Sequence, residues 1–132
     1  MRYEFREETP GVADYRRLRA AAGLSPRSEA AARRGLPNTV HAVTVHEEAV
    51  VGMGRIVGDD GCFYQVVDVA VLPDHQGQGL GTRIVEALVE HLREHAPRTA
   101  YVSLMADVDG FYERFGFAET APESKGMFMR IE

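Results

Sequence analysis

The chain has 132 residues, of which 45% are hydrophobic and 27% are charged, and its net charge is −5. This length supports one hydrophobic core but not two, so we expect a single domain over residues 1–132. The negative net charge argues against nucleic acid as a partner, because phosphates require a clustered basic surface. No apolar run approaches the ~20 residues that a membrane helix needs, so we expect no membrane partner.

Cysteine usage and the first residues bear on the cellular compartment. The one cysteine, Cys62, cannot form an internal disulfide, and residues 1–6 lack the apolar core of a signal peptide. Both observations favour a reducing, cytoplasmic location. The five histidines show no spacing typical of metal ligands, so no metal site is expected.

Hydrophobic periodicity predicts strands and helices in an α+β order. Residues 3–6 alternate as a strand, and residues 14–22 predict a helix that ends at Gly23. Ser25 and Pro26 are typical of a helix start, and this second helix is expected to stop at Gly35. Residues 39–46, 49–57 and 63–71 then predict three consecutive antiparallel strands, with a strong turn signal at residues 58–61.

The second half of the chain continues this order with a long amphipathic helix. Leu80, Ile84, Leu88 and Leu92 recur on one helical face. Residues 100–105 predict the next strand, and a short helix carries Tyr112. Residues 127–131 are expected to close the sheet as a final strand.

A glycine-rich turn lies between the third antiparallel strand and the long helix. Three glycines within five residues, Gly77, Gly79 and Gly81, open directly into that helix. Glycines lack the Cβ atoms that would keep an anion away, and a helix N-terminus presents backbone N–H groups and the positive end of the helix dipole. The sequence therefore predicts a phosphate-binding site at residues 76–81.

Two common phosphate-binding loops do not fit this turn. The nucleotide P-loop requires a lysine after its glycines, and none is present here. The dinucleotide fingerprint requires a glycine where Thr82 stands. The spacing that does fit is Q/R-x-x-G-x-G/A, with Gln76, Gly79 and Gly81 in place.

At these residues the chain resembles the GNAT superfamily of N-acetyltransferases, whose pyrophosphate-binding motif has this form. A second segment at residues 111–117, Phe-Tyr-Glu-Arg-Phe-Gly-Phe, is similar to a later motif of the same family. The resemblance implies an α+β sandwich: a mixed, mostly antiparallel central sheet with helices on both faces. It also implies acetyl-CoA as co-substrate.

The resemblance assigns the coenzyme to two neighbouring segments. The backbone of Val69, Ala70 and Val71 would bind the pantetheine arm, which enters between two diverging strands. The backbone amides of the turn would bind the pyrophosphate, and the residues of the turn are Gln76, Gly77, Gln78, Gly79, Leu80 and Gly81.

Acetyl transfer to an amine also needs an acid and a route for the ammonium proton. Tyr112 matches the family tyrosine that protonates the departing thiolate and also contacts the coenzyme. Many family members place a glutamate or histidine where this chain has Gln65. An ordered water held by Gln65, a carboxylate such as Asp68, Asp107 or Glu29, or an acceptor amine of low pKa remain open as alternatives. In a regular strand Asp68 would point away from Gln65, but a β-bulge would reverse that, and pairing with Arg55 is an equally good interpretation.

The acceptor is expected to be a primary amine of a small molecule, acetylated by direct transfer within a ternary complex. Residues 111–117 look most like the family branch that acts on aralkylamines, although the histidines of that branch are absent. The alternatives are acetylation of a protein or peptide amine, and a non-catalytic acyl-CoA sensor. Small GNAT domains often pair, so a homodimer through the last strand is possible within this interpretation.

Overall fold

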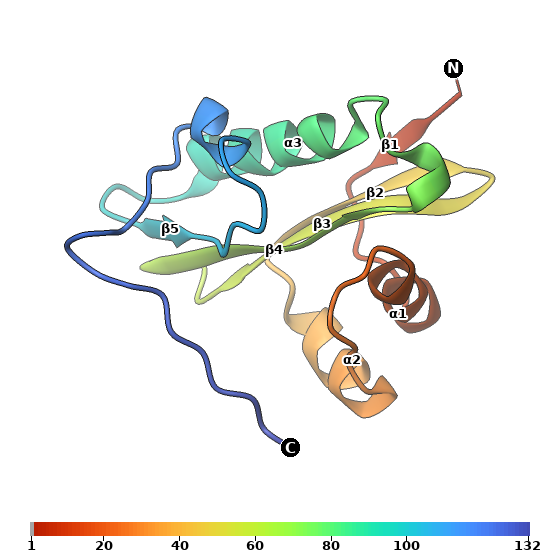
Figure 1. The fold of residues 1–132 in the computed structure, drawn as a ribbon, viewed down its shortest axis with the longest axis horizontal. Coiled ribbons are helices and arrows are strands. Elements are labelled where there is room, and N and C mark those ends of the chain that lie inside the picture. Colours follow the sequence, from red (N-terminus) through yellow and green to blue (C-terminus); the bar gives the residue numbers. More distant parts are fainter. Residues whose placement is uncertain (1) are drawn as a thin grey trace.

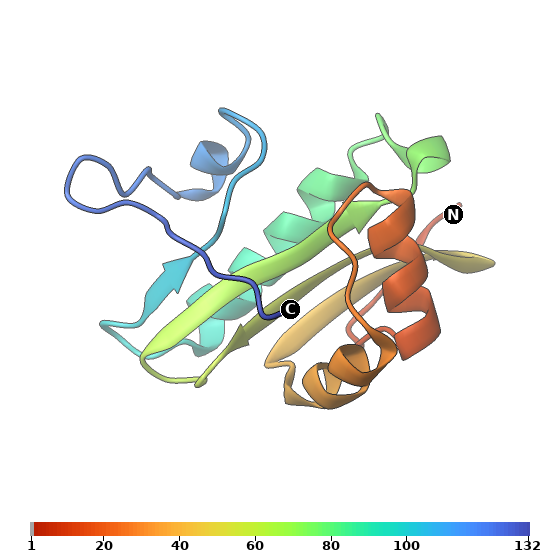
Figure 2. The same cartoon turned by 60° about the horizontal axis from the view of Figure 1, so that its bottom comes forward.

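The computed structural model of the protein describes residues 2–132. Its centre is a five-stranded sheet in the order β1-β2-β3-β4-β5, with α1 and α2 on one face and α3 on the other (Figures 1 and 2). The strands are β1 (Glu4–Arg6), β2 (His41–Glu47), β3 (Ala49–Gly58), β4 (Phe63–Val71) and β5 (Tyr101–Ser103). The helices are α1 (Val12–Ala21), α2 (Glu29–Gly35) and α3 (Leu80–His95), with three short 3₁₀ turns, η1 (Leu36–Asn38), η2 (Pro73–His75) and η3 (Tyr112–Phe115).

Strands β1 to β4 are antiparallel neighbours, and tight turns join the last three of them. The β3–β4 turn is organised by Asp59, whose Oδ1 accepts backbone hydrogen bonds from Gly61, Cys62 and Phe63 at 2.8–3.0 Å. These donors stabilise the charged carboxylate and lower the pKa of Asp59. Strand β5 pairs with β4 in parallel, as expected for a strand reached through the crossover helix α3.

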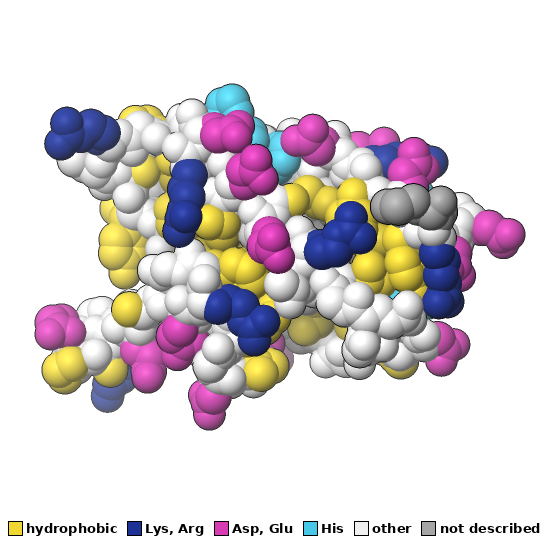
Figure 3. Space-filling view, turned by 90° about the horizontal axis from the view of Figure 1, so that it is seen from above, with side chains coloured by type: hydrophobic (Ala, Val, Ile, Leu, Met, Phe, Trp, Pro, Cys, Tyr) yellow, Lys and Arg dark blue, Asp and Glu magenta, His cyan; other side chains and the backbone are white. Residues whose placement is uncertain are grey.

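Helix α3 covers one face of the sheet with the four leucine and isoleucine side chains that its periodicity predicts. Leu80, Ile84, Leu88 and Leu92 are between 0% and 5% exposed and pack on apolar side chains of β2, β3 and β4. The contact with β3 is close at Gly54, where a Cβ atom would lie 2.5 Å from Ile84 Cγ2. The opposite, solvent-facing side of this layer intersperses acidic and basic side chains rather than gathering one sign (Figure 3).

Helices α1 and α2 cover the other face, and here the sequence prediction needs a correction. Tyr15 and Leu18 of α1 pack against Met53 and Ala70 of the sheet. Helix α2 begins at Glu29 rather than at residue 26, and Ser28 is its N-cap, accepting a 3.0 Å hydrogen bond from Ala31 N. Ser25 has another role, because its carbonyl and hydroxyl oxygens accept hydrogen bonds from a buried arginine of α1.

The expected final strand at residues 127–131 is wrong. In the structure this segment runs away from β5 toward α2 without regular structure (Figures 1 and 2). Its large apolar side chains Met127, Phe128, Met129 and Ile131 are 81–91% exposed. The apolar pattern is that of a strand, but among residues 2–132 no strand pairs with this segment.

Among residues 2–132, no helix combines the length and the apolar character needed to cross a bilayer. Across the same residues, no group of three or more His, Cys, Asp or Glu side chains is placed to hold a metal ion.

Candidate coenzyme and catalytic site

Strands β4 and β5 diverge after a short stretch of pairing. Their register is Phe63 with Tyr101, Tyr64 with Val102 and Gln65 with Ser103, after which β5 ends and β4 continues to Val71. Within residues 2–132, the edge of β4 beyond Gln65 that faces away from β3 therefore has no strand partner. An extended ligand can add to such an edge through backbone hydrogen bonds.

The three residues expected to bind the pantetheine arm lie on this part of β4, which pairs with β3 on one edge and is open on the other. Ala70 is buried against α1, whereas Val69 and Val71 are partly buried on the α3 side. Their side chains fill the two cores, so only their backbone groups remain available at the open edge. This agrees with a role that does not depend on side-chain identity.

A β-bulge interrupts β4 just before these residues. The register passes from Arg55–Val67 to Met53–Ala70, so Asp68 and Val69 together oppose the single residue Gly54. Asp68 adopts a left-handed backbone conformation with φ of 59°. The bulge turns the Asp68 side chain toward α1, on the same face as Ala70.

The carboxylate of Asp68 is the centre of a buried ion-pair cluster. Arg55 Nη1 donates to Asp68 Oδ2 at 2.7 Å, Tyr15 Oη donates to Oδ1 at 3.1 Å, and Arg19 Nη1 also pairs with Oδ1. The three charged side chains are only 5–8% exposed. Burial and the nearby Asp68 raise the pKa of the Tyr15 phenol. The pairing with Arg55 is thus present, and a second arginine joins it.

The glycine turn leads from β4 into α3 with the geometry of an anion site. After η2, Gly77 and Gly79 both adopt φ of 79°, a conformation that favours glycine. Gly79 is the N-cap of α3 and supplies no side chain to cap it, so the first amides of the helix point outward. A Cβ atom at Gly77, Gly79 or Gly81 would meet nothing within 4 Å, which leaves room for a ligand above the turn.

Side chains at both ends hold this turn in place. Leu80, 2% exposed, anchors the start of α3 in the core. Gln76 Nε2 donates to the Val71 carbonyl at 2.9 Å, which ties the turn back to the end of β4. These two anchors hold the turn in one conformation, and a preorganised site loses less entropy on binding.

Arg2 and Tyr3, which directly precede β1, also contact the turn, and no local pattern in the sequence predicts these contacts. Arg2 pairs with Glu47 and donates from Nη1 to Gln78 Oε1 at 3.3 Å. The Tyr3 hydroxyl and His75 Nδ1 are hydrogen-bonded at 2.9 Å. The contacts with Gln78 and His75 join positions 76 and 72 residues apart, and the pairing of β1 with β2 brings these positions together.

Tyr112 lies in a groove of about 790 Å³ between β5 and the segment that follows η3. The residues lining the groove include Ser103, Met105, Tyr112 and Phe117. The Tyr112 ring makes an edge-on contact with Phe111, and a longer one with Phe117. Burial and, secondarily, the charge of Asp107 raise the pKa of Tyr112, so its hydroxyl stays protonated at neutral pH.

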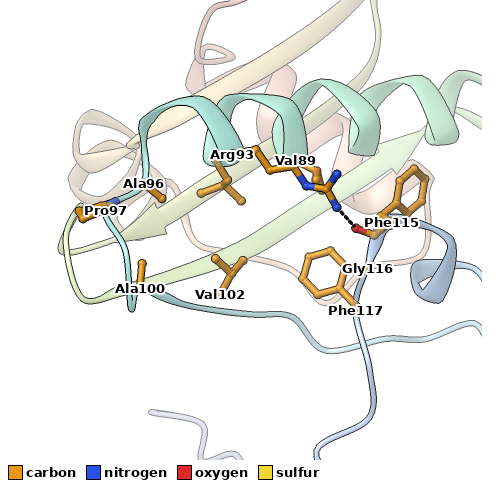
Figure 4. A pocket seen from close by; sticks show the side chains of 10 residues that line it. Val89, Arg93, Ala96, Pro97, Ala100, Val102, Phe115, Gly116 and Phe117 are labelled. Atoms are coloured by element: carbon orange, nitrogen blue, oxygen red, sulfur yellow. Dashed lines mark hydrogen bonds between the residues drawn. The ribbon is translucent and has the colours of Figure 1, made fainter.

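A smaller pocket of about 340 Å³ lies on the other side of Phe117 (Figure 4). There Arg93 of α3 donates to the Phe115 carbonyl at 3.0 Å, and Val102 and Phe117 face each other across the opening. This hydrogen bond fixes the segment that carries Tyr112 to the side of α3.

Comparison with known proteins decides the family. Residues 37–119 match the acetyltransferase (GNAT) domain. The chain belongs to the GNAT family. This match includes the unpaired part of β4, the glycine turn, α3 and Tyr112, so the family expected from the two sequence motifs is confirmed.

Solved and curated proteins agree with this GNAT assignment. A probable acetyltransferase of unknown function from meticillin-resistant Staphylococcus aureus is 39% identical, with a TM-score of 0.91 over 98% of this chain and 99% of that one. A chloroplastic serotonin N-acetyltransferase from Oryza sativa is 35% identical over 82% of this chain and 56% of its own length. An uncharacterized N-acetyltransferase from Pyropia yezoensis is 35% identical over 60% of this chain and 45% of its own. The chain spans about half the length of these curated relatives.

The GNAT fold expected from the sequence is confirmed, with its mostly antiparallel sheet and helices on both faces. The site assignments themselves stay predictions. Gln65 lies beside Ser103 at the point where β4 and β5 diverge, next to the groove that holds Tyr112. Glu29 pairs with Arg33 at 3.1 Å on the surface. The coenzyme residues lie together along β4 and the glycine turn, whereas Asp68 faces α1.

Proposed function

We propose that this domain transfers the acetyl group of acetyl-CoA to a primary amine of a small molecule. The single observation that carries the proposal is the outward-pointing, uncapped N-terminus of α3 beside an unpaired stretch of β4. Backbone amides would bind the pyrophosphate, and the open edge of β4 would bind the pantetheine arm. A GNAT structure from Brucella melitensis, 23% identical, was solved with acetyl-CoA.

Charge-assisted hydrogen bonds are worth about 1.5–3 kcal/mol each. A few such bonds from residues 76–81 to the pyrophosphate are enough for micromolar affinity after the entropy cost of binding. The pyrophosphate also gains from the positive end of the α3 dipole, which acts over the first turn of the helix.

Tyr112 is the proposed general acid. A phenol with a raised pKa remains protonated at pH 7 and donates to the departing thiolate, whose conjugate thiol has a pKa of about 8.5 by analogy with cysteine. Direct transfer within a ternary complex requires no covalent intermediate on the protein, so this one proton donor and a deprotonation route complete the chemistry.

For deprotonation we propose a water held beside Gln65. An alkyl amine with a pKa of about 10.4 is neutral in roughly one molecule in several thousand at pH 7, so a route for its proton increases the rate. Asp68 is a poor alternative because two buried arginines already bind its carboxylate. Two other carboxylates were candidate bases. The charge of Asp107 acts on Tyr112 and raises the pKa of that phenol, and Glu29 pairs with Arg33 on the surface.

The most specific part of the proposal is the chemical class of the acceptor amine. The rice relative that aligns over 82% of this chain is named for serotonin, an arylalkylamine. Other relatives are named for a phosphorylated amino sugar and for histones. We therefore place arylalkylamines first among candidate acceptors, with a protein amine as the alternative.

The experiment is a thiol-release assay with acetyl-CoA across a panel of arylalkylamines, amino sugars, polyamines and lysine peptides. The proposal expects amine-dependent release of CoA with at least one small amine and confirmation of the acetylated product by mass spectrometry. Tight acetyl-CoA binding with no turnover on any amine would instead indicate a sensor. Turnover on peptides alone would replace the small-molecule acceptor with a protein amine.

A further inference from the structure

Three arginine side chains converge on one serine hydroxyl in the loop that joins α1 to α2. The Oγ atom of Ser25 accepts from Arg27 Nη1 at 3.0 Å, from Arg19 Nη2 at 3.2 Å and from Arg130 Nη1 at 3.5 Å. The three arginines come from α1, from the loop itself and from the C-terminal end of the chain, which reaches the side of the sheet that α1 and α2 cover (Figures 1 and 2). Three positive groups are thus gathered around one neutral atom.

One hydroxyl cannot satisfy three such donors. A serine oxygen has two lone pairs, whereas each guanidinium carries five N–H groups and no acceptor. The carbonyl of Ser25 accepts two more bonds from Arg19, and the carbonyl of Pro26 accepts one from Arg27. Among residues 2–132, Arg130 has no hydrogen-bond acceptor besides Ser25 Oγ. The cluster therefore holds more N–H groups than acceptors that contact them.

The charges of this cluster are also unbalanced. In the part of the chain that the structure describes, Arg27 and Arg130 take part in no ion pair, and Arg19 shares the carboxylate of Asp68 with Arg55. The acidic side chain of α1 and that of α2 each pair with an arginine of their own helix instead. Like charges held this close repel one another, so an anion placed between them stabilises the arrangement.

Arg19 gives the cluster a fixed, buried base. It is only 6% exposed, and its Nε and Nη2 atoms both donate to the Ser25 carbonyl, at 2.9 and 2.6 Å, while Nη1 pairs with Asp68. Arg27 and Arg130 are exposed and lie on the solvent side of this base. A ligand would therefore meet one preorganised guanidinium and two that can adjust to it, which limits the entropy lost on binding.

We propose that Arg19, Arg27 and Arg130 form a binding site for a phosphate-type oxyanion, which bridges the α1–α2 loop and the C-terminal end of the chain. Guanidinium groups bind phosphate oxygens through short, charge-assisted and often bidentate hydrogen bonds. A phosphate group offers several oxygens to donors that approach from three directions, whereas a carboxylate offers only two. The site shares no residue with the glycine turn, so its existence does not depend on acetyl transfer.

The first test is a titration of inorganic phosphate into isotope-labelled protein, followed through the side-chain Nε–H signals of the arginines by NMR. The signals of Arg19, Arg27 and Arg130 are expected to shift saturably with phosphate but not with chloride at equal ionic strength. Arg27→Gln and Arg130→Gln are each expected to weaken phosphate binding by roughly tenfold, because each removes a charge-assisted donor.

Arg34→Gln is the matched control, since it removes the same charge from an exposed position of α2 and is expected to leave the affinity unchanged. Absence of a saturable shift would overturn the proposal. So would an Arg27→Gln or Arg130→Gln variant with wild-type affinity, or an equal loss of affinity in Arg34→Gln, which would indicate only a diffuse effect of net charge.

The second test addresses the bridge and the source of the phosphate. Amide hydrogen exchange of residues 126–132 is expected to slow in phosphate, and this slowing is expected to be lost in Arg27→Gln. Exchange that phosphate leaves unchanged would contradict the bridge. Phenyl phosphate that binds as tightly as inorganic phosphate would assign the site to phosphate monoesters, and binding at least tenfold weaker would assign it to the free ion. None of these readouts uses acetyl-CoA, so failure of this site and failure of the proposed function are separable.

Discussion

Gln76 and Val71 join the two halves of the proposed coenzyme site, because the Gln76 amide donates a 2.9 Å hydrogen bond to the Val71 carbonyl. Val71 ends the strand that would bind the pantetheine arm, and Gln76 begins the turn that would bind the pyrophosphate. This contact therefore helps to set the distance between the two subsites, together with the anchoring of Leu80 in the core. Substituting Gln76 tests whether the spacing matters.

Gln76→Ala is expected to weaken acetyl-CoA affinity by roughly tenfold, since the loss of one hydrogen bond costs about 1 kcal/mol and the turn also becomes less ordered. Its midpoint of urea unfolding is expected to change little, because the side chain is exposed. Calorimetric titration with acetyl-CoA measures the first quantity. Gln78→Ala is the neighbouring control, and an equal loss of affinity in both variants would argue against a specific tether.

Tyr112→Phe is expected to lower turnover by about 10²-fold while acetyl-CoA affinity holds, because only the proton donor is removed. Tyr101→Phe removes the hydroxyl of another tyrosine that lines the groove and serves as the control. A Tyr112→Phe enzyme with wild-type turnover would assign the proton to another donor.

The pH profile provides a second test of Tyr112. Its pKa is raised, so the acid stays protonated and active up to a pH above the ordinary phenol value of about 10, and activity is lost only beyond that. Asp107→Asn removes one of the two causes of the raised pKa and is expected to move the alkaline limit of turnover to lower pH. An alkaline limit that does not move in Asp107→Asn would separate this limit from Tyr112.

Asp68→Asn is expected to destabilise the fold by about 3 kcal/mol or more, because it leaves two buried arginines without their counter-charge. Urea unfolding measures this loss. Glu29→Gln breaks the exposed pair with Arg33 and is expected to cost at most about 0.5 kcal/mol. If Asp68→Asn kept its stability but lost turnover at neutral pH, the carboxylate would be the base after all.

Gln65→Leu is expected to lower kcat/KM at neutral pH by about tenfold, because it removes the proposed holder of the water that accepts the ammonium proton. The deficit should shrink as the pH rises toward the pKa of the amine, since more acceptor is then already neutral. A rate profile over pH for wild type and variant is the measurement. A deficit that is constant across pH would point to a packing defect instead.

Much of the fold could be predicted from the sequence because its signals are local. The leucine and isoleucine positions of α3 share one face, and the turn residues 58–61 predict the β3–β4 hairpin. The helix start at Ser25 was wrong because two serines compete there. Ser28 caps α2, while the buried guanidinium of Arg19 binds Ser25. This is a tertiary contact, which no local sequence pattern predicts.

The site shows the same division between local and long-range information. The glycines of the turn could be predicted, because the backbone conformation at Gly77 and Gly79 favours glycine. The environment of Asp68 could not, since it depends on a bulge opposite Gly54 and on arginines from α1 and β3. The segment 127–131 has the apolar pattern of a strand but lacks a place in the sheet of its own chain.

The central claim is that the backbone amides at the start of α3 bind the pyrophosphate of acetyl-CoA. Calorimetric titration of acetyl-CoA into Gly79→Asp, with Gly79→Asn as the uncharged control, tests it most directly. Both variants carry the same backbone strain at φ of 79°, so their difference isolates the negative charge. The account predicts micromolar binding to the wild type, weakened binding to Gly79→Asn and none to Gly79→Asp, with all three folded by circular dichroism. Wild-type affinity in Gly79→Asp would contradict it.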